Sequence, residues 1–400
     1  MSDCVVYSGR AYQRYLKCDF KKQYMRSVDV EHIERGIIVN EHFHGFGVFT
    51  PDFKFVKSSL QVRKNNGQFT PKFNHNNIPY VDKDVVFVGN VYPQFGHFLL
   101  EHLNRAWALL DNKYKKMHVV LINNQDVNPV PEYMFVFLEL LGIKRNKIII
   151  LNQTTQFKNV YVPCQGYNLP VYSCPEFGKT FDCMAKNVPD ISDVCDKIYM
   201  SRDAMKERRT RGEKFISKIF QDNGFRVVYP ETLPLTEQIA IVKNCRVLAG
   251  CAGTALHLAL FMQPGGTVVQ IKRNRKKKDN ASTQYLINKT KGLNSVFIDA
   301  AIEKRATDHG GFCPQIIGLN KYMRQFLDDN GFVYSCDLPI IDDETWQEYI
   351  GAIEEYEGVN GGQFTYSCKT KFVRISSCFI PGRENRGRYR RWIKSKFGIK

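Results

Sequence analysis

The stretch that decides the fold is residues 247–261, which read Val247-Leu248-Ala249-Gly250-Cys251-Ala252-Gly253-Thr254-Ala255-Leu256-His257-Leu258-Ala259-Leu260-Phe261. Their order predicts a buried strand, a tight glycine turn and an apolar helix. Gly250 and Gly253 leave no side chain at the turn, so the backbone can approach a ligand closely. Thr254 and Ala255 then place free amide groups at the start of the helix, where an anion is favoured. The same pattern also fits a turn that serves packing alone, and the sequence leaves both readings open.

A group of arginines precedes this stretch. Residues 199–202 read Tyr199-Met200-Ser201-Arg202, and after them come Arg208, Arg209 and Arg211. Arg202 directly follows a predicted buried strand, and ligands of open α/β sheets bind at that edge. A guanidinium group there can bind a diphosphate through two parallel hydrogen bonds. The later arginines are also typical of a solvated loop. The pattern favours a nucleotide-linked substrate, with Arg202 as the stronger candidate.

Short apolar runs alternate with helical patterns from residue 84 onward, which implies parallel βαβ units. In the first unit we expect strands at 85–88, 118–122 and 147–151 and helices at 97–110 and 131–141. In the second unit we expect strands at 197–200, 225–228, 246–249 and 267–271 and helices at 213–222, 235–243 and 255–262. The region between the units is rich in proline and predicts a loop-rich crossing with Pro163, Pro170, Pro175 and Pro189.

Together the two units predict an α/β protein with two Rossmann-like domains. We place the N-terminal domain at residues 1–195, the second domain at 196–305 and a helical extension with a basic tail at 306–400. A helix is expected at 342–356, where an acidic first turn begins it. Residues 1–75 hold short strand-like runs whose topology the sequence leaves open.

The chain is strongly basic. Its 400 residues carry a formal net charge of +17, and 43% of them are hydrophobic, enough for ordinary cores. Such a charge fits nucleic acid, an anionic membrane surface or an anionic substrate as the partner. The positive charge gathers at 272–278 and in the tail at 383–400. The tail has Trp392 among its cations and fits either docking at an anionic membrane or a solvated end.

Neither export nor a metal centre is predicted. No apolar stretch has the length of a spanning helix, and the first residues lack a basic region ahead of an apolar one. The 12 Cys form no C-x-x-C pair and no zinc-finger spacing, so we expect reduced thiols in a cytoplasmic protein. Asp82-Lys83-Asp84 precedes a strand instead of following one, and we interpret it as a turn without a metal.

A second candidate site follows the strand at 85–88. Asn90 comes soon after this run, and His97, Glu101 and Arg105 follow at positions i, i+4 and i+8. In an α-helix this spacing places the three side chains on one face. A histidine and a carboxylate stacked in this way can orient one another for proton abstraction. The spacing also fits a solvated face with an ion pair between Glu101 and Arg105.

Two further polar residues lie close to the ends of predicted elements. Glu231 follows the strand at 225–228 and can either hold the hydroxyls of a ribose or cap a loop. Gln238 lies in the helix before the glycine turn, where an ordinary surface position is the alternative. The glycine turn lacks both the G-x-G-x-x-G pattern of dinucleotide sites and a Gly-Lys-Ser/Thr sequence. Nicotinamide chemistry and ATP hydrolysis are therefore disfavoured.

Taken together, the order of these motifs resembles that of the family-61 glycosyltransferases. The resemblance covers about residues 85–300, and the matching residues are Asn90, His97 and Glu101; Tyr199 to Arg202; Arg208, Arg209 and Glu213; Pro230 and Glu231; Leu235 to Ile239; and Gly250 to Leu260. Many members carry His where Ala252 stands and Asn where Leu258 stands. These departures point to the bacterial-like branch that makes capsular polysaccharides.

The resemblance implies a GT-B architecture, in which two Rossmann-like domains face each other across a cleft. It also implies an inverting transfer of a sugar from a nucleotide donor, commonly a UDP-sugar, to a hydroxyl of a glycan acceptor, with no cofactor and no essential metal. The second domain would bind the donor. The donor-binding residues implied are Ser201, Arg202, Arg208, Arg209, Glu231, Gln238, Gly250, Gly253, Thr254, Ala255 and His257.

The first domain would bind the acceptor and supply the catalytic base. We expect His97 to be the base and Glu101 to orient it, although the reverse assignment stays open. Asn90 and Arg105 are expected to bind the acceptor. The expected protein is a cytoplasmic transferase of polysaccharide or glycan biosynthesis, peripheral to a membrane if its acceptor is linked to a lipid. Two alternatives stay open, namely a basic nucleic-acid-binding protein without catalysis and an inactive family member that binds glycans.

Overall fold

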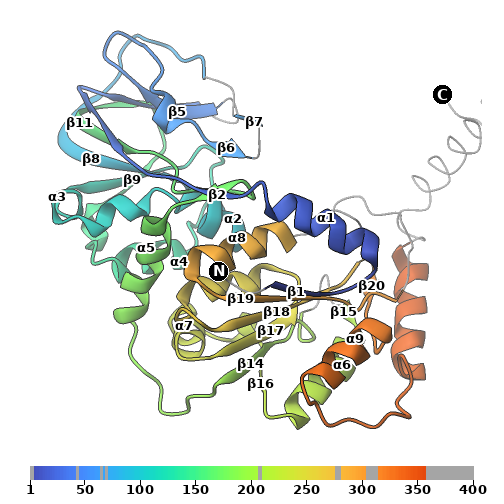
Figure 1. Cartoon of the computed structure of the whole chain (residues 1–400). Coiled ribbons are helices and arrows are strands. Elements are labelled where there is room, and N and C mark those ends of the chain that lie inside the picture. The colour runs from blue at the N-terminus through green and yellow to red at the C-terminus, as the bar shows by residue number, and fades with distance from the viewer. Residues whose placement is uncertain are drawn as a thin grey trace, which may run out of the picture.

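The computed structural model of the chain describes residues 4–41, 45–63, 66–67, 71–205, 210–274, 281–302 and 314–356. Two main sheets carry the fold, and helices pack around them (Figure 1). The chain mixes helices with parallel strands, so the predicted α/β class is confirmed. Within the described residues, no helix is both long and apolar enough to cross a lipid bilayer. Arg208, Arg209, the basic residues at 275–278 and the tail at 383–400 lie outside the described ranges.

One sheet has six strands, all parallel, in the order β1-β19-β18-β17-β14-β16. Its strands are β1 (Cys4–Tyr7), β14 (Lys197–Met200), β16 (Arg226–Val228), β17 (Val247–Cys251), β18 (Thr267–Lys272) and β19 (Asn294–Asp299). Parallel strands are usually covered on both faces, and the runs at 198–200 and 248–251 are accordingly buried. The four strands predicted for the second unit are confirmed in this sheet, with bounds that differ by one or two residues.

Helices connect these strands. They are α6 (Glu213–Asp222), α7 (Leu235–Lys243), the 3-10 helix η6 (Thr254–Phe261), α8 (Ala281–Lys291) and α9 (Lys321–Asp329). α6 and α7 have the predicted bounds, and residues 343–356 are helical as expected. The helix predicted at 255–262 is confirmed at Thr254–Phe261, as a 3-10 helix. Residues 256–261 are all buried, and tertiary packing holds them in the tighter 3-10 form.

The other main sheet has seven strands in the order β10-β9-β8-β11-β4-β5, with β3 also paired to β11. Its strands are β3 (Val30–Glu34), β4 (Ile37–Glu41), β5 (Gly45–Phe49), β8 (Tyr80–Asn90), β9 (His118–Ile122), β10 (Ile148–Leu151) and β11 (Thr155–Pro163). β8 to β11 pair in parallel, whereas the pairings of β3, β4 and β5 are antiparallel. The three predicted strands are confirmed, and so is the second predicted helix as α4 (Glu132–Leu140). The turn predicted at Asp82–Asp84 is wrong, because β8 begins at Tyr80 and runs through these residues.

Residues 155–186 contain more regular structure than the loop-rich crossing that the prolines predict. β11 lies between β8 and β4 inside the sheet, and α5 (Pro175–Lys186) is a long helix with Pro175 at its first turn, where proline is tolerated. β11 shows no regular alternation of polar and apolar residues, and its partner strands β3, β4 and β8 come from distant segments, so its pairing is not visible locally. Its Asn159 Nδ2, for example, donates to Asp84 Oδ1 at 2.7 Å.

Shorter elements complete the fold. They are β2 (Tyr24–Met25), β12 (Tyr167–Asn168) and β13 (Tyr172–Ser173) in one small sheet, the pairs β6 (Val62–Arg63) with β7 (Asn66–Gly67) and β15 (Thr210–Arg211) with β20 (Gln315–Ile316), the 3-10 turns η1 (Lys57–Ser59), η4 (Arg145–Lys147) and η5 (Pro230–Thr232), and the helix α3 (Asn112–Lys115).

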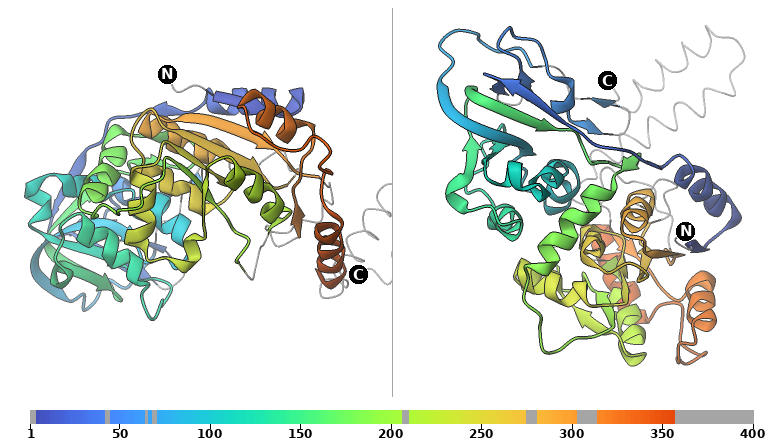
Figure 2. Two further views of the ribbon diagram at one scale, coloured as in Figure 1. Left: turned by 90° about the horizontal axis from the view of Figure 1, so that it is seen from below. Right: turned by 60° about the vertical axis from the view of Figure 1, so that its left-hand side comes forward.

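The N-terminal segment belongs to the six-stranded sheet, although the sequence left its topology open. β1 pairs with β19, and the helix α1 (Arg10–Phe20) lies against α8 (Figure 2). The rings of Phe20 and Tyr285 stack with their centroids 3.9 Å apart. Only then does the chain reach the other sheet through β3, β4 and β5. The chain thus contributes to both sheets before residue 50.

A single large hydrophobic core joins the two sheets. It contains Val86 of β8, Phe137 of α4, Leu248 of β17 and Phe261 of η6, all of them fully buried. The rings of Phe137 and Phe261 stack with their centroids 6.4 Å apart. A continuous core of this kind resists separation of its two sides, because parting them would expose apolar surface to water.

The segment predicted as one helix at 97–110 is broken into three pieces. These are α2 (Phe95–His97), the π-helix η2 (Phe98–His102) and the 3-10 helix η3 (Ala106–Leu110). The wide turn is closed by Leu103 N–H, which donates to Phe98 O at 2.8 Å. All residues of η2 are buried against neighbouring elements, so packing overrides the regular α-helical period. The i, i+4, i+8 spacing therefore does not define one common face.

Candidate active site

Arg202 and the glycine turn meet at the carboxyl edge of the six-stranded sheet. β14 and β17 are neighbours there, with Met200 paired to Gly250, so the residues that follow the two strands come together. A Cβ atom on Gly250 would lie 2.7 Å from Met200 O. A Cβ atom on Gly253 would lie 2.8 Å from Arg202 Nη1, closer than real Cβ contacts. Glycine at 253 therefore makes room for the guanidinium group of Arg202.

Arg202 is itself held by buried groups. Arg202 is only 8% exposed, and its backbone N–H donates to Glu213 Oε1 at 3.1 Å. Among the described residues, Arg202 Nε is buried and has no hydrogen-bond partner. Buried polar groups normally have a partner, so this guanidinium group has unused capacity to bind an anion.

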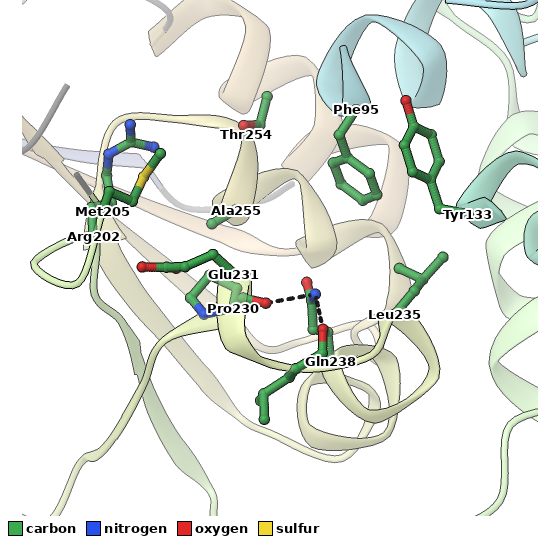
Figure 3. A pocket seen from close by; sticks show the side chains of 11 residues that line it. Phe95, Tyr133, Arg202, Met205, Pro230, Glu231, Leu235, Gln238, Thr254 and Ala255 are labelled. Atoms are coloured by element: carbon green, nitrogen blue, oxygen red, sulfur yellow. Dashed lines mark hydrogen bonds between the residues drawn. The ribbon is translucent and has the colours of Figure 1, made fainter. Parts of the chain in front are cut away.

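Arg202 borders a cavity of about 370 Å³. The other lining residues are Phe95, Tyr133, Met205, Pro230, Glu231, Leu233, Leu235, Gln238, Thr254 and Ala255. Figure 3 shows Arg202, Met205 and Glu231 at one end of this cavity and Phe95, Tyr133 and Leu235 at the other. One end is thus charged and the other is apolar and aromatic, a composition typical of small-molecule sites.

The polar wall of the cavity is fixed by Gln238. Its Nε2 donates to Pro230 O at 2.8 Å and to Leu233 O at 2.9 Å, which closes the turn η5 (Figure 3). Glu231 lies on this turn, exposed and facing the cavity. Ser201 is fully buried, and its Oγ accepts from Asp203 N–H at 3.2 Å. Ser201 and Gln238 thus shape the loops that carry Arg202 and Glu231.

His97 and Glu101 form the predicted pair, although on an unexpected kind of helix. Their Nδ1 and Oε1 atoms are 3.0 Å apart, and the side chains are 27% and 12% exposed. Because an ionised carboxylate only accepts hydrogen bonds, the His97 proton lies on Nδ1 and Nε2 keeps a free lone pair. The pair lies next to the cavity, since Phe95 lines it and a Cβ atom on Gly96 would overlap the methyl group of Thr254.

Arg105 and Asn90 are placed differently from the expectation. Arg105 is fully buried, and its guanidinium group donates to three backbone carbonyls, those of Pro163 at 2.9 Å, Ser58 at 3.1 Å and Leu60 at 2.9 Å. Burial lowers the pKa of Arg105 to about 10. Asn90 is 2% exposed, and its Nδ2 donates to Asn124 Oδ1 at 3.3 Å. Neither residue presents a surface to an acceptor, so in this conformation they support the site from inside the fold.

The comparisons with known proteins agree with the motifs. Residues 95–269 match the family model described as Glycosyltransferase 61. The chain contains a glycosyltransferase 61 domain. The matched segment includes every residue that lines the cavity, as well as His97 and Glu101. The family implies glycosyltransferase activity in general. No protein in the curated collection matches the chain.

His257 in this glycosyltransferase 61 domain has a defined tautomer. Gln284 Nε2 donates to Leu256 O at 3.1 Å, so the Oε1 atom of Gln284 faces His257 Nδ1, 3.1 Å away. His257 Nδ1 must therefore carry the proton, and Nε2 is an acceptor. Burial lowers the pKa of His257 to about 4, which the bond to Gln284 opposes and the nearby His97 reinforces. His257 is thus neutral at physiological pH and lies close to α2, since a Cβ atom on Gly96 would lie 3.6 Å from its ring.

Several residues of the cavity were not expected from the sequence. Phe95 and Tyr133 reach it from α2 and α4, and Tyr133 OH donates to Tyr92 O at 3.1 Å. No sequence motif predicts which aromatic residues from other elements line the cavity. Met205 follows Arg202 closely and could have been included on that ground.

Proposed function

We propose that the protein is an inverting glycosyltransferase that moves a sugar from a nucleotide donor, a UDP-sugar, to a hydroxyl group of a glycan acceptor. The observation that carries the proposal is the position of Arg202, which lies against Gly253 and borders a cavity that also holds Glu231. At one end of this cavity, the cation and the bare backbone suit the diphosphate of such a donor, and the carboxylate suits the hydroxyls of its ribose.

The charged end would stabilise the leaving diphosphate. Negative charge develops on the diphosphate as the bond to the sugar breaks, and fixed cations and amide groups lower that barrier. Arg202 provides the cation, and the first amides of η6, at Thr254 and Ala255, lack intrahelical partners. We include Arg208 and Arg209 in this role, although they lie outside the described residues. With these groups the reaction would need neither a metal ion nor a cofactor.

The His97 end would activate the acceptor. The acceptor oxygen attacks the anomeric carbon of the donor sugar, and the bond from that carbon to the diphosphate oxygen breaks with its electron pair leaving on the nucleotide. His97 Nε2 takes the hydroxyl proton, while Glu101 fixes the ring and stabilises the imidazolium. Attack opposite the leaving group inverts the configuration at the anomeric carbon. His257 Nε2, a neutral acceptor close by, can hold a hydroxyl of either substrate.

The wider setting of the reaction is also proposed. We assign the two halves a GT-B arrangement, with the donor on the six-stranded sheet and the acceptor on the side of His97. The acceptor would be a glycan or a lipid-linked glycan of polysaccharide biosynthesis. The basic tail would hold a cytoplasmic enzyme at the anionic surface of a membrane. The tail contains Arg390, Arg391 and Trp392 and lies outside the described residues.

The donor assignment is tested by a thermal-shift screen of nucleoside diphosphates and nucleotide sugars. A ligand that binds the native state raises the melting temperature. UDP and UDP-sugars should give the largest shifts, and incubation with glycan acceptors should release UDP. UDP binding without hydrolysis or transfer would instead indicate an inactive glycan-binding protein. No nucleotide binding together with steeply salt-dependent binding of DNA or RNA would favour a nucleic-acid-binding protein.

A further inference from the structure

Glu213 contacts the segment that follows β14 and carries Arg202 (residues 201–205, the Arg202 loop). It is the first residue of α6 and is 0% exposed. Gly212 before it has φ +81°, and a Cβ atom there would overlap the carbonyl oxygen of Ile317. This left-handed turn, which glycine adopts without strain, directs the start of α6 into the protein. Glu213 Oε1 then accepts from Arg202 N–H at 3.1 Å, while Oε2 is buried without a hydrogen-bond partner among the described residues.

The groups that face Glu213 come from three strands of the sheet. They are Tyr199 on β14, Cys251 on β17, and the cations Arg202 and Arg273, which follow β14 and β18. Burial raises the pKa of Glu213 to about 7, and the hydrogen bond and charge of Arg202 oppose this rise together with Cys251 and Arg273. Burial also raises the pKa of Tyr199 and of Cys251 well above their ordinary values, with Glu213 adding to each. Tyr199 and Cys251 are therefore neutral where Glu213 titrates.

We propose that Glu213 is a positioning residue whose carboxyl group holds the Arg202 loop and takes up a proton when a diphosphate binds at Arg202. The inference rests on the proposed function, because it requires a diphosphate at that guanidinium group. It assigns Glu213 no contact with the substrate.

The coupling follows from electrostatics. An ionised Glu213 attracts Arg202 and repels an incoming diphosphate, whereas a protonated Glu213 leaves the guanidinium charge to the ligand. The bound anion in turn favours the protonated carboxyl group, and by reciprocity the proton favours the bound anion by the same factor. The solvent supplies the proton on binding and recovers it when the nucleotide leaves. Diphosphate affinity should therefore fall as the pH rises through about 7, where Glu213 ionises.

Isothermal titration calorimetry of UDP in buffers of different ionisation enthalpy tests the inference. The wild-type protein should take up a fraction of a proton between pH 7 and 8, beyond what UDP itself contributes. The Glu213→Gln variant keeps an oxygen that can accept from Arg202 N–H and mimics the protonated acid, so it should bind UDP like the wild type at pH 6. From pH 6 to 8.5 the wild-type affinity should fall at least about fivefold more than that of the variant, the lower end of usual couplings.

Controls separate this role from a purely structural one. UDP has its own phosphate titration near pH 6, which cancels in the comparison because both proteins bind the same ligand. Cys251→Ala keeps the carboxyl group and should retain the proton uptake. A structural role alone would give Glu213→Gln a loss of affinity that is equal at every pH.

The possible results fall into separate classes. UDP binding to the wild type without proton uptake would overturn the inference and leave the proposed function intact. This measurement needs no variant, so it holds even if Glu213→Gln does not fold. A wild-type protein that binds no UDP would overturn the donor assignment and, with it, this inference.

Discussion

The helix α2, which ends at His97, and the turn that carries Gly253 meet at one cavity but are held in different ways. Arg202 at the Gly253 turn is 8% exposed and fixed by neighbouring strands and by Glu213. His97 is more exposed, and its ring is oriented by a hydrogen bond to Glu101 on a π-helix and by an edge-on contact with the Tyr92 ring. We infer that the diphosphate end is preformed, whereas the proton-transfer end relies on the pair of His97 and Glu101, supported by the Tyr92 ring. Changes at the two ends should therefore affect different steps.

The largest effect is expected from Arg202→Ala. It removes the cation of the diphosphate end, so UDP should no longer raise the melting temperature, and kcat/KM for transfer should fall at least about 10³-fold, the upper range for loss of one stabilising group. Thermal shift and initial rates measure the two effects. Arg246→Ala is the matched control, because Arg246 lies exposed just before β17. Wild-type UDP binding in Arg202→Ala would remove Arg202 from the donor site.

His97→Ala should separate the two ends. Loss of a general base typically costs about 10²–10⁴ in rate, so transfer should fall by that factor. UDP binding should stay within twofold of the wild type, roughly the scatter of surface substitutions. Glu101→Gln should fall between the wild type and His97→Ala, because the ring loses its anionic partner. An unchanged transfer rate in His97→Ala would exclude His97 as the base.

A smaller effect is expected from Gly253→Ala. The new Cβ atom would lie 2.8 Å from Arg202 Nη1, so the guanidinium group must move away from the turn. UDP affinity should fall about tenfold, equivalent to about 1.4 kcal/mol, while stability changes little because the displaced group ends a flexible side chain. Gly351→Ala is the control, since its Cβ atom would meet nothing within 4 Å. Equal affinity in Gly253→Ala and the wild type would show that Arg202 does not need the bare turn.

The smallest effect concerns the aromatic end of the cavity. Tyr133→Phe removes the hydrogen bond from the phenol to Tyr92 O and should lower the free energy of unfolding by about 1 kcal/mol. UDP affinity should change far less than in Gly253→Ala, because the aromatic ring stays in place. Urea unfolding and calorimetry measure both quantities, with the exposed Tyr229→Phe as the control. A larger loss of UDP affinity than of stability would mean that the phenol itself contacts the ligand.

The sequence predicts those parts of the site that local chemistry specifies. Strands β14 and β17 are short apolar runs, and Arg202 and Gly253 each lie two residues after the end of their strand, so their meeting can be inferred from parallel pairing alone. The position of Arg105 could not be inferred, because its carbonyl partners at Ser58 and Leu60 come from a distant segment. The π-helix at 98–102 could not be inferred either, because the packing of its buried residues against other elements determines its form.

The fold shows the same division. The strands and helices between residues 197 and 272 repeat at short spacing and were predicted to within one or two residues, whereas α8 and β19 were not predicted. β1 and β11 were not predicted either, because each is specified by a partner strand far away in the sequence, β19 for the first and β8 for the second. The local sequence of a strand does not specify a distant partner, because the pairing depends on which strand edges the rest of the fold leaves unpaired.

The most direct test of the central claim is a crystal structure of the protein with UDP. We predict that diphosphate oxygens lie about 3 Å from the guanidinium group of Arg202 and from the amide nitrogens at Thr254 and Ala255, the usual range of charge-assisted hydrogen bonds. A diphosphate bound elsewhere, with no contact to Arg202, would contradict it.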